Sequence, residues 1–477
     1  MLRSLQIKNF KGWQDTGKIR FAPITLFMGS NSSGKSSIGQ LLMLLKQSST
    51  TSDRRTVLFL GDSNAVVELG GPIDMLYKHD SSKHLEFSYK WSLPEQVSLV
   101  TSSGSEEESN SFLCDEIAFS DQIAVHETES QTLEIEKLQF LEVEKMQYDI
   151  LAKNILQFSV GLERVQKPSS ARAYKMISRI CELKRVAGRA WEMPSPYRFY
   201  GFPDEMIAYY KNAWFTPQLN ALHERFFSTI SYLGPLRERA ERHYRWTGFI
   251  PSSVGVTGKD TILALLAARA GNRLYNYKAK QHLQTLDVII ANAMKNMGLI
   301  EHFEITKIAE GRQDYDVKVM ASGSQTLTDI PDVGFGISQV LPVLVQLYYA
   351  PANSIIIMEQ PELHLHPSAQ SALADAMIDA ISAREKARPR NIQLIIETHS
   401  EHFLRRFQRR IAEGSLSNES FAAFFANNDT TPLTLEQLQI NLFGEIINWP
   451  RNFFGDMNGD IFMQTKAALE RKLKEVQ

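Results

Sequence analysis

The sequence predicts a mixed α/β fold whose central parallel sheet is assembled from both ends of the chain. Residues 24–28 (ITLFM) are an apolar strand that enters a loop rich in glycine and serine. Residues 354–358 (SIIIM) are a second apolar strand, and acidic residues follow it. Residues 392–397 (IQLIIE) form a third strand after an intervening helix. Because strand–helix–strand units place their strands in parallel, the second and third strands are expected to be neighbours.

The loop after the first strand has the spacing of a phosphate-binding loop. Residues 29–36 (GSNSSGKS) fit Gly-x4-Gly-Lys-Ser without a mismatch. Glycines in this pattern let backbone N–H groups point at a phosphate, while Lys35 reaches the outer phosphates and the Ser36 hydroxyl can hold Mg²⁺. A helix follows, so its N-terminus also faces the anion. This context disfavours an ordinary surface turn. The candidate ATP-binding residues here are Gly29, Ser30, Asn31, Ser32, Ser33, Gly34, Lys35, Ser36 and Ser37.

Composition sets broad limits on the protein. The chain has 477 residues, 43% of them hydrophobic, and a net charge of -2. The length allows several packed domains, and the charge provides no overall basic field, so any nucleic-acid contact must come from a local patch. Cys114 and Cys181 are far apart, which favours a reducing compartment over a zinc site. The N-terminus lacks an apolar signal region and no long apolar run occurs, so we expect a cytoplasmic protein without membrane contact.

The first half of the chain is expected to divide into two regions. Residues 1–125 form the N-terminal lobe around the phosphate loop, with short strands at Leu5–Ile7, Val66–Leu69 and Leu85–Tyr89 and a polar loop at 101–111. Residues 126–300 form a mainly helical insertion for dimer or partner contacts. Its helices are expected at 133–165, 207–230 and 261–297. A compact helical subdomain is favoured over a coiled-coil arm because no heptad pattern persists.

A second glycine-rich helix start follows in the C-terminal lobe, residues 301–412. Residues 303–330 alternate through two turns and predict a β-meander. The meander leads to Gly334, Gly336 and Ser338, and the next helix is expected to start near Ser338 with Pro342 in its first turn. Its N-terminus suits an anion. The interleaved arginines Arg239, Arg242 and Arg245 lie among acidic residues, which favours a solvated face over a nucleic-acid contact.

The acidic strand end is the expected catalytic region. Glu359, Gln360 and Glu362 follow the strand at 354–358 and occupy the Walker B position. His364 and His366 offer only two ligands, so zinc is disfavoured. The next strand delivers Thr398, His399 and Ser400 to the same edge. Residues 413–477 form a tail in which Asp456 and Asp460 are interpreted as turn formers.

The helix at 401–411 carries a group of arginines opposite an apolar face. The group consists of Arg405, Arg406, Arg409 and Arg410. A solvated face, a nucleic-acid contact and an acidic partner protein all fit this pattern.

Together these motifs resemble the ABC-type ATPases of the RecF, SMC and OLD (overcoming lysogenization defect) group. The resemblance covers residues 1–90 and 300–405, and residues 359–367 (EQPELHLHP) and 397–400 (ETHS) are most similar to the OLD-like branch. Residues 444–456 are similar to the ending of ATPases from bacterial anti-phage operons of the Septu, PARIS or Menshen type. The resemblance implies one head built from N- and C-terminal lobes and two heads that sandwich two ATP molecules.

The resemblance also implies roles for single residues. Lys35 and Ser36 bind phosphate and Mg²⁺, Glu359 supports the metal, and His399 senses the γ-phosphate. Gly336 and Ser338 approach the γ-phosphate bound to the opposite subunit. The chain departs from the family pattern because Gln360 occupies the position of the catalytic glutamate. An amide cannot act as general base, so we expect slow hydrolysis, with Glu362 as a further candidate base.

The function implied is an ATP-driven homodimeric or larger sensor and scaffold for a separate effector, a nuclease or toxin, in bacterial anti-phage defence. About 75 residues follow His399, too few for the nuclease domain of OLD enzymes, so no intrinsic nuclease is expected. The expected cofactors are ATP and Mg²⁺, with DNA or RNA as further partners. The alternatives are a RecF-like DNA-repair ATPase and a structural assembly head with negligible hydrolysis.

Overall fold

The computed structural model describes most of the chain. The described residues are 1–102, 111–129, 137–165, 174–188, 192–276, 282–450, 462–468 and 471. Most of the expected polar loop at 101–111, the tail similarity beyond residue 450, and Asp456 and Asp460 lie outside the described residues.

A six-stranded sheet at the centre of the molecule joins the two ends of the chain. Its order is β10-β17-β20-β4-β21-β22, and only the edge pair β21–β22 is antiparallel. The strands are β10 (Ile230–Leu233), β17 (Ile355–Glu359), β20 (Gln393–Glu397), β4 (Ile24–Gly29), β21 (Phe421–Asn427) and β22 (Thr434–Gln437). Because β4 lies between β20 and β21, the predicted assembly from both chain ends is confirmed.

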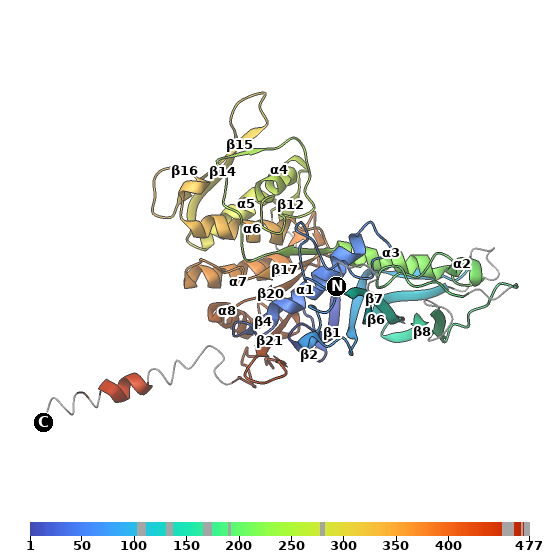
Figure 1. The fold of residues 1–477 in the computed structure, drawn as a ribbon. Coiled ribbons are helices and arrows are strands. Elements are labelled where there is room, and N and C mark those ends of the chain that lie inside the picture. Colours follow the sequence, from blue (N-terminus) through green and yellow to red (C-terminus); the bar gives the residue numbers. More distant parts are fainter. Residues whose placement is uncertain are drawn as a thin grey trace.

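Helices cover both faces of this sheet, which is why its central strands β17, β20 and β4 are mostly apolar. In β17, Ile355 and Ile357 pack into one core cluster, whereas Ile356 and Met358 pack into the other. The first cluster contains α1 (Lys35–Thr50) and α3 (Phe215–Ser228). The second contains α6 (Phe335–Tyr349), α7 (Pro367–Ser382) and α8 (Glu401–Ala412). Figure 1 shows α7 and α8 beside β17, β20 and β4.

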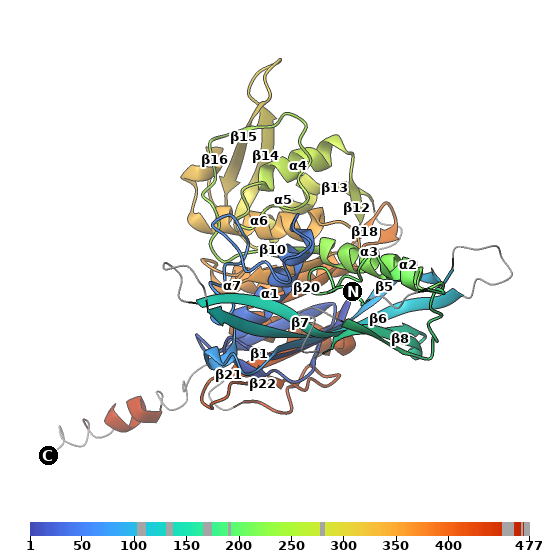
Figure 2. The same cartoon turned by 45° about the vertical axis from the view of Figure 1, so that its right-hand side comes forward.

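A second, antiparallel sheet of eight strands packs on the far side of α1 and α3. Its order is β2-β1-β5-β6-β7-β8-β9, with β3 paired to β1. Figure 2 shows its long strands crossing the molecule below α3. The strands are β1 (Leu2–Phe10), β2 (Trp13–Asp15), β3 (Ile19–Arg20), β5 (Leu85–Val100), β6 (Ser111–Glu129), β7 (Lys137–Ala152), β8 (Ile155–Arg164) and β9 (Tyr174–Arg179).

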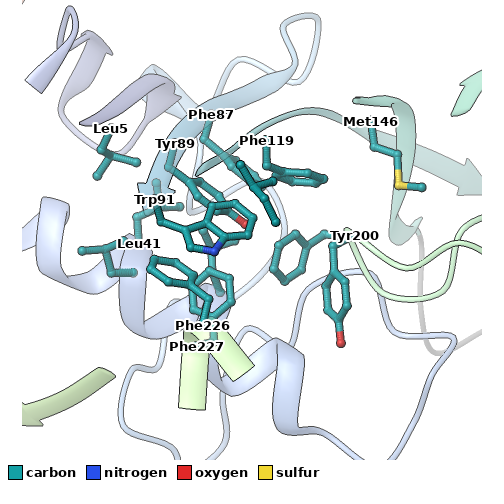
Figure 3. Packing of buried hydrophobic residues seen from close by; sticks show 14 of the residues in the cluster. Leu5, Leu41, Phe87, Tyr89, Trp91, Phe119, Met146, Tyr200, Phe226 and Phe227 are labelled. Atoms are coloured by element: carbon teal, nitrogen blue, oxygen red, sulfur yellow. The ribbon is translucent and has the colours of Figure 1, made fainter. Parts of the chain in front are cut away.

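Aromatic side chains fill the space between this sheet and α3 (Figure 3). The Trp91 and Phe226 rings stack with centroids 4.9 Å apart. His223 is fully buried among them, with Nε2 2.7 Å from the Tyr89 hydroxyl and Nδ1 2.7 Å from the Tyr148 hydroxyl. Since Tyr148 donates to the Tyr200 carbonyl, His223 donates from Nδ1 and accepts at Nε2. Burial lowers the pKa of His223 well below its usual value, so this histidine is a neutral core residue.

The expectation of a mainly helical segment at 126–300 is wrong for its first part. Residues 137–165 form β7 and β8, not a helix. Their Leu, Glu, Lys and Gln content favours helix, but pairing with β6 overrides that preference. The alternation of buried Met146, Tyr148 and Ile150 with Lys145, Gln147 and Asp149 is the strand signal in this stretch. The helices expected at 207–230 are present as α2 (Met206–Tyr209) and α3.

The upper part of the molecule in Figure 1 contains α4 (Thr261–Ala270), α5 (Leu286–Asn296) and a meander. The predicted meander is confirmed as β14 (Ile300–Lys307), β15 (Asp314–Ala321) and β16 (Thr328–Asp329), with β11 (His243–Arg245) at its edge. The helix predicted over 261–297 is interrupted by a small sheet. That sheet contains β12 (Leu274–Asn276), β13 (Gln284–Thr285), β18 (Arg384–Glu385) and β19 (Arg388–Pro389).

Two smaller expectations also fail. Residues 66–69 form no strand, although Val67 and Leu69 are buried against the core. Helix α6 begins at Phe335 rather than near Ser338, so Pro342 lies inside the helix. A proline there has no N–H for the carbonyl of Ser338, four residues earlier.

Short 3₁₀ turns complete the secondary structure: η1 (Tyr77–His79), η2 (Ile330–Asp332) and η3 (Asn418–Ser420).

Cys114 and Cys181 are both buried, free thiols. Among the described helices, none is long and apolar enough to cross a bilayer.

Candidate nucleotide-binding site

The predicted phosphate loop connects β4 to α1 at the carboxyl edge of the central sheet. Gly29 has a φ of 140°, and a Cβ there would lie 2.2 Å from the Ala426 carbonyl oxygen, so only glycine fits between β4 and β21. Gly34 has a φ of 84° and caps α1. These two backbone positions explain the glycine spacing of the motif.

The lysine of the loop is folded back onto the loop itself. Lys35 Nζ donates to the Ser30 carbonyl at 2.6 Å, to the Gly29 carbonyl at 3.1 Å and to Ser33 Oγ at 3.3 Å. Burial lowers the pKa of Lys35, and the nearby carboxylate of Glu397 opposes that effect. The ammonium group is therefore already placed inside the loop, among oxygen acceptors that a phosphate could replace.

Residues from the C-terminal part of the chain also hold the loop. Ser30 Oγ donates to Asn428 Oδ1 at 2.7 Å, and Asn428 Nδ2 donates to the Asn31 carbonyl at 3.2 Å. Ser32 adopts a φ of 59°, and Ser37 N donates to the Gly34 carbonyl at 3.2 Å. Sequence reasoning missed Asn428, because only the pairing of β21 with β4 brings it here.

Two carboxylates lie side by side next to this loop. Glu359 ends β17 and Glu397 ends β20, and the two residues pair directly across the parallel strands. Ser36 Oγ donates to Glu397 Oε1 at 3.0 Å. Burial and the neighbouring Glu397 raise the pKa of Glu359 to about 7. Burial also raises the pKa of Glu397, while the Ser36 hydrogen bond opposes the shift. Through Glu397, the structure thus places the Ser36 hydroxyl and Glu359 at the same edge of the sheet.

Two further residues position the acidic strand end and were missed by sequence reasoning. The Tyr232 hydroxyl at the end of β10 donates to Glu359 Oε1 at 2.9 Å. Arg237 is 7% exposed and donates to the carbonyls of Glu359 at 3.3 Å, Gln360 at 3.2 Å and Gln339 at 3.4 Å. Arg237 therefore connects the acidic strand end to helix α6. Burial lowers the pKa of its guanidinium to about 10.

Gln360 and Glu362 occupy different environments. Gln360 has a φ of 44°, a backbone region that non-glycine residues rarely adopt, and its N–H donates to the Glu397 carbonyl at 2.8 Å. Glu362 is 6% exposed and accepts hydrogen bonds from Thr398 Oγ1 at 2.5 Å and His399 N at 3.1 Å. Glu362 thus ties the loop after β17 to the loop that carries His399.

His399 lies against the phosphate loop. Burial and the nearby Lys35 charge lower the pKa of His399, while a hydrogen bond to the backbone of Gly29 opposes the shift. A neutral imidazole next to Gly29 can exchange a hydrogen bond with a bound phosphate. This placement fits the predicted sensor histidine.

The glycine-rich start of α6 makes a different set of contacts. A Cβ on Gly336 would lie 3.2 Å from the His364 carbonyl oxygen, and the Phe335 ring packs edge-on against His364 with centroids 4.9 Å apart. Ser338 Oγ donates to the Phe335 carbonyl at 2.9 Å. These contacts belong to α6 and the loop after β17.

The arginines of α8 are paired with acidic residues of the same chain. Arg406 and Arg410 contact Asp375 at 3.2 Å and 2.7 Å. Arg405 contacts Glu401 at 3.1 Å, and Arg409 contacts Glu413 at 2.6 Å. This pairing fits the solvated-face interpretation better than a free anion-binding surface.

The residues at this edge fit a nucleoside triphosphate with its divalent cation. The loop offers backbone N–H groups and Lys35 for phosphate. The cation would find the Ser36 hydroxyl and the carboxylates of Glu359 and Glu397. Glu397 Oε2 is buried and has no hydrogen-bond partner among the described residues, and a bound cation would satisfy this oxygen.

Known proteins share parts of this architecture. A family model described as AAA ATPase domain matches residues 1–179 and 272–404. Another model, described as Protein of unknown function (DUF3696), matches residues 416–464. No curated protein matches the chain significantly.

Solved structures similar to the chain include three heads of SMC proteins. The SMC head domain from Thermotoga maritima has 10% sequence identity and a TM-score of 0.38, with 92% of this chain and 99% of that one covered. An SMC head bound to the C-terminal winged-helix domain of ScpA has 10% identity, a TM-score of 0.39, and 92% and 98% coverage. An SMC head with an extended coiled coil, bound to the C-terminal domain of ScpA derived from Pyrococcus furiosus, has 10% identity, a TM-score of 0.36, and 92% and 96% coverage.

Proposed function

The chain belongs to the AAA ATPase domain family, and from this premise we propose that it is an ATP-dependent switch. In this proposal two copies close over Mg²⁺-bound ATP, hydrolyse it slowly and thereby control a separate effector, a nuclease or toxin, in bacterial anti-phage defence. The observation that supports it is the hydrogen bond between Ser36 and Glu397 beside Glu359. This contact joins the phosphate loop near the start of the chain to acidic residues more than three hundred positions later.

The chemistry of each residue follows from its place. Lys35 and the loop N–H groups neutralise the phosphates, and Tyr232 and Arg237 hold the acidic strand end in position. When bound, Mg²⁺ draws negative charge from the outer phosphate oxygens. His399 connects the γ-phosphate position to Glu362 through its own backbone N–H. Because the amide of Gln360 cannot take a proton from the water that attacks the γ-phosphate, hydrolysis is slow. The ATP-bound dimer therefore persists.

The second copy completes the site in this proposal. Gly336 and Ser338 lie at the N-terminus of α6, whose partial positive charge favours a phosphate. They pack on the loop after β17, and in this proposal their phosphate partner is the nucleotide of the other subunit. The paired arginines of α8 favour this switch over direct DNA clamping by that helix.

Light scattering coupled to gel filtration tests the proposal. The wild-type protein should bind fluorescent ATP and should double in mass when ATP and Mg²⁺ are added. Lys35→Ala should lose nucleotide binding, and Ser338→Glu should keep binding but remain a monomer, because a carboxylate there repels the partner's phosphates. Retained ATP binding by Lys35→Ala, or an unchanged dimer with Ser338→Glu, would contradict it.

The link to an effector needs a separate experiment. Copurification of the tagged chain with the product of a neighbouring gene, with and without ATP, should yield a complex whose amount depends on the nucleotide. Equal recovery in both conditions would exclude control of the effector by ATP.

A further inference from the structure

Glu397 is one of the two paired carboxylates, and although it begins the stretch 397–400 (ETHS), no role was assigned to it from the sequence. Its strand, β20, lies between β4 and β17, the strands that carry the phosphate loop and Glu359. Glu397 is paired with Phe27 on one side and Glu359 on the other. Its side chain therefore lies where the two halves of the pocket meet.

Each of the two carboxylates accepts a hydrogen bond from one hydroxyl group. One hydroxyl fixes one oxygen of each: Tyr232 donates to Glu359 Oε1 at 2.9 Å and Ser36 donates to Glu397 Oε1 at 3.0 Å. A free oxygen remains on each group, and for Glu397 that oxygen is buried without a partner. A buried, unsatisfied carboxylate oxygen is costly unless a cation or donor fills the place beside it.

Among the described residues, no lysine or arginine donates a hydrogen bond to Glu397 Oε2. The Lys35 ammonium group makes its hydrogen bonds to Gly29, Ser30 and Ser33, all within the phosphate loop. Arg237 bonds to backbone carbonyls behind the strand end. The Lys35 charge is near Glu397 but donates its hydrogen bonds within the loop, so two carboxylates and one hydroxyl remain as oxygen ligands of the kind that Mg²⁺ prefers.

We propose that Glu397 is a second carboxylate of the divalent-cation site and binds the cation together with Ser36 and Glu359. The inference rests on the proposed ATP binding, since the cation arrives with the nucleotide. Through its hydrogen bond with Ser36, Glu397 also orients the hydroxyl, so that Ser36 presents a lone pair to the metal. The strand end thus supplies the negative charge that Gln360 lacks.

Manganese binding measured by electron paramagnetic resonance tests this inference without relying on turnover. Mn²⁺ is titrated into protein saturated with a non-hydrolysable ATP analogue. Glu397→Gln should weaken Mn²⁺ binding by about 10- to 100-fold, the usual cost of altering a metal site's ligands or their supports. The affinity for fluorescent ATP in EDTA should stay within about twofold, because that measurement contains no metal. Glu436→Gln, an exposed glutamate on β22, is the matched control and should change neither value.

The outcomes separate this inference from the proposed function. If the wild-type protein does not bind fluorescent ATP, the proposed function fails. If it binds ATP, but Glu397→Gln leaves Mn²⁺ binding unchanged while Glu359→Gln abolishes it, Glu397 is only an acceptor for Ser36 and the inference is overturned. If Glu397→Gln has a lower melting temperature than the wild type, the Mn²⁺ titration is repeated with Glu397→Asp. The shorter side chain should still weaken Mn²⁺ binding at least fivefold, and unchanged binding overturns the inference equally.

Discussion

Gln360 combines an uncharged amide with a backbone conformation that few residues adopt. Its φ of 44° is held by the hydrogen bond from its N–H to the Glu397 carbonyl. Such a conformation persists only where surrounding contacts enforce it, and it commonly marks a functional position. A change of the side chain from amide to carboxylate should therefore leave the backbone in place and alter only the chemistry.

Gln360→Glu should accelerate ATP hydrolysis by roughly 100-fold, because it supplies the general base that the amide cannot provide. Steady-state phosphate release is the measurement, and the affinity for fluorescent ATP should remain unchanged. The same substitution in a Lys35→Ala background is the control and should show no hydrolysis. A rate equal to that of the wild type would mean that residue 360 does not contact the attacking water.

Asp121 is a carboxyl group in the core of the antiparallel sheet. It is 1% exposed, and within the described part of the chain neither of its oxygens accepts a hydrogen bond of ordinary geometry, although the nearby N–H of Gln122 partly stabilises its charge. Burial raises the pKa of Asp121 well above its usual value. Because the folded-state pKa is raised, stability is highest below the unfolded pKa of about 3.9 and falls as the pH rises toward the folded value.

Asp121→Asn should therefore stabilise the protein, and more so at pH 8 than at pH 5, with a gain of roughly 1–3 kcal/mol at the higher pH. Urea denaturation at the two pH values is the measurement. Glu95→Gln, which removes an exposed carboxylate from the same sheet, should have little effect at either pH. A loss of stability in Asp121→Asn at pH 8 would show that the carboxylate has a stabilising partner.

At the scale of elements, one buried arginine connects β17 to α6 by hydrogen bonds. Arg237 donates hydrogen bonds to backbone carbonyls at the end of β17 and in α6. Because the acceptors are backbone atoms, these bonds depend on Arg237 and not on the side chains at the strand end. The loop after β17 and the start of α6 face different nucleotides in the proposed dimer. In that proposed dimer, Arg237 would connect the two sites of one subunit.

Arg237→Leu should lower ATP turnover by at least about tenfold, as loss of a supporting contact commonly does, while ATP binding by the phosphate loop stays within about twofold. Phosphate release and fluorescent ATP titration measure the two effects. Arg242→Leu is the control, since Arg242 is an exposed arginine of the same segment paired with Asp332. Equal ATP turnover in the two variants would show that Arg237 does not position the acidic strand end.

The elements differ in how far the sequence could predict them. Strands β4, β17 and β20 could be predicted because both of their faces are buried, so each appears in the sequence as a short run of apolar residues. The phosphate loop was readable because its glycines occupy special backbone angles. Strand β7 was not, because its charged and leucine-rich composition also suits a helix and only pairing with β6 decides between them.

The site was predicted less completely than the fold. Ser36, Glu359 and His399 follow local motifs, but Tyr232, Arg237 and Asn428 reach the site only through sheet order. Glu397 was visible as a strand end, yet its contact with Ser36 depends on β20 lying beside β4. Tertiary neighbours of this kind leave no pattern in a single sequence.

At the scale of the whole molecule, one buried glutamine joins the two large sheets. Gln393, at the start of β20, accepts from Leu2 N at 2.9 Å and donates to the Leu2 carbonyl at 2.9 Å and the Ala22 carbonyl at 3.0 Å. It thus fixes β1 and the entrance to β4 against the C-terminal lobe.

Gln393→Leu should destabilise the protein by roughly 2–5 kcal/mol, because it leaves buried backbone groups of Leu2 and Ala22 without partners. Urea unfolding followed by tryptophan fluorescence measures the loss. Gln437→Leu on the exposed edge strand β22 is the control and should change stability by less than about 0.5 kcal/mol. Similar values for both variants would show that the sheets are held together by apolar packing alone.

The position of β4 between β20 and β21 has a consequence for biosynthesis. A ribosome makes both neighbours of β4 (Ile24–Gly29), namely Gln393–Glu397 and Phe421–Asn427, more than three hundred residues after β4 itself. Until then the nascent strand has two unpaired, apolar edges, a state prone to aggregation. A ribosome that stalls before residue 393 therefore releases a fragment in which this strand has neither neighbour.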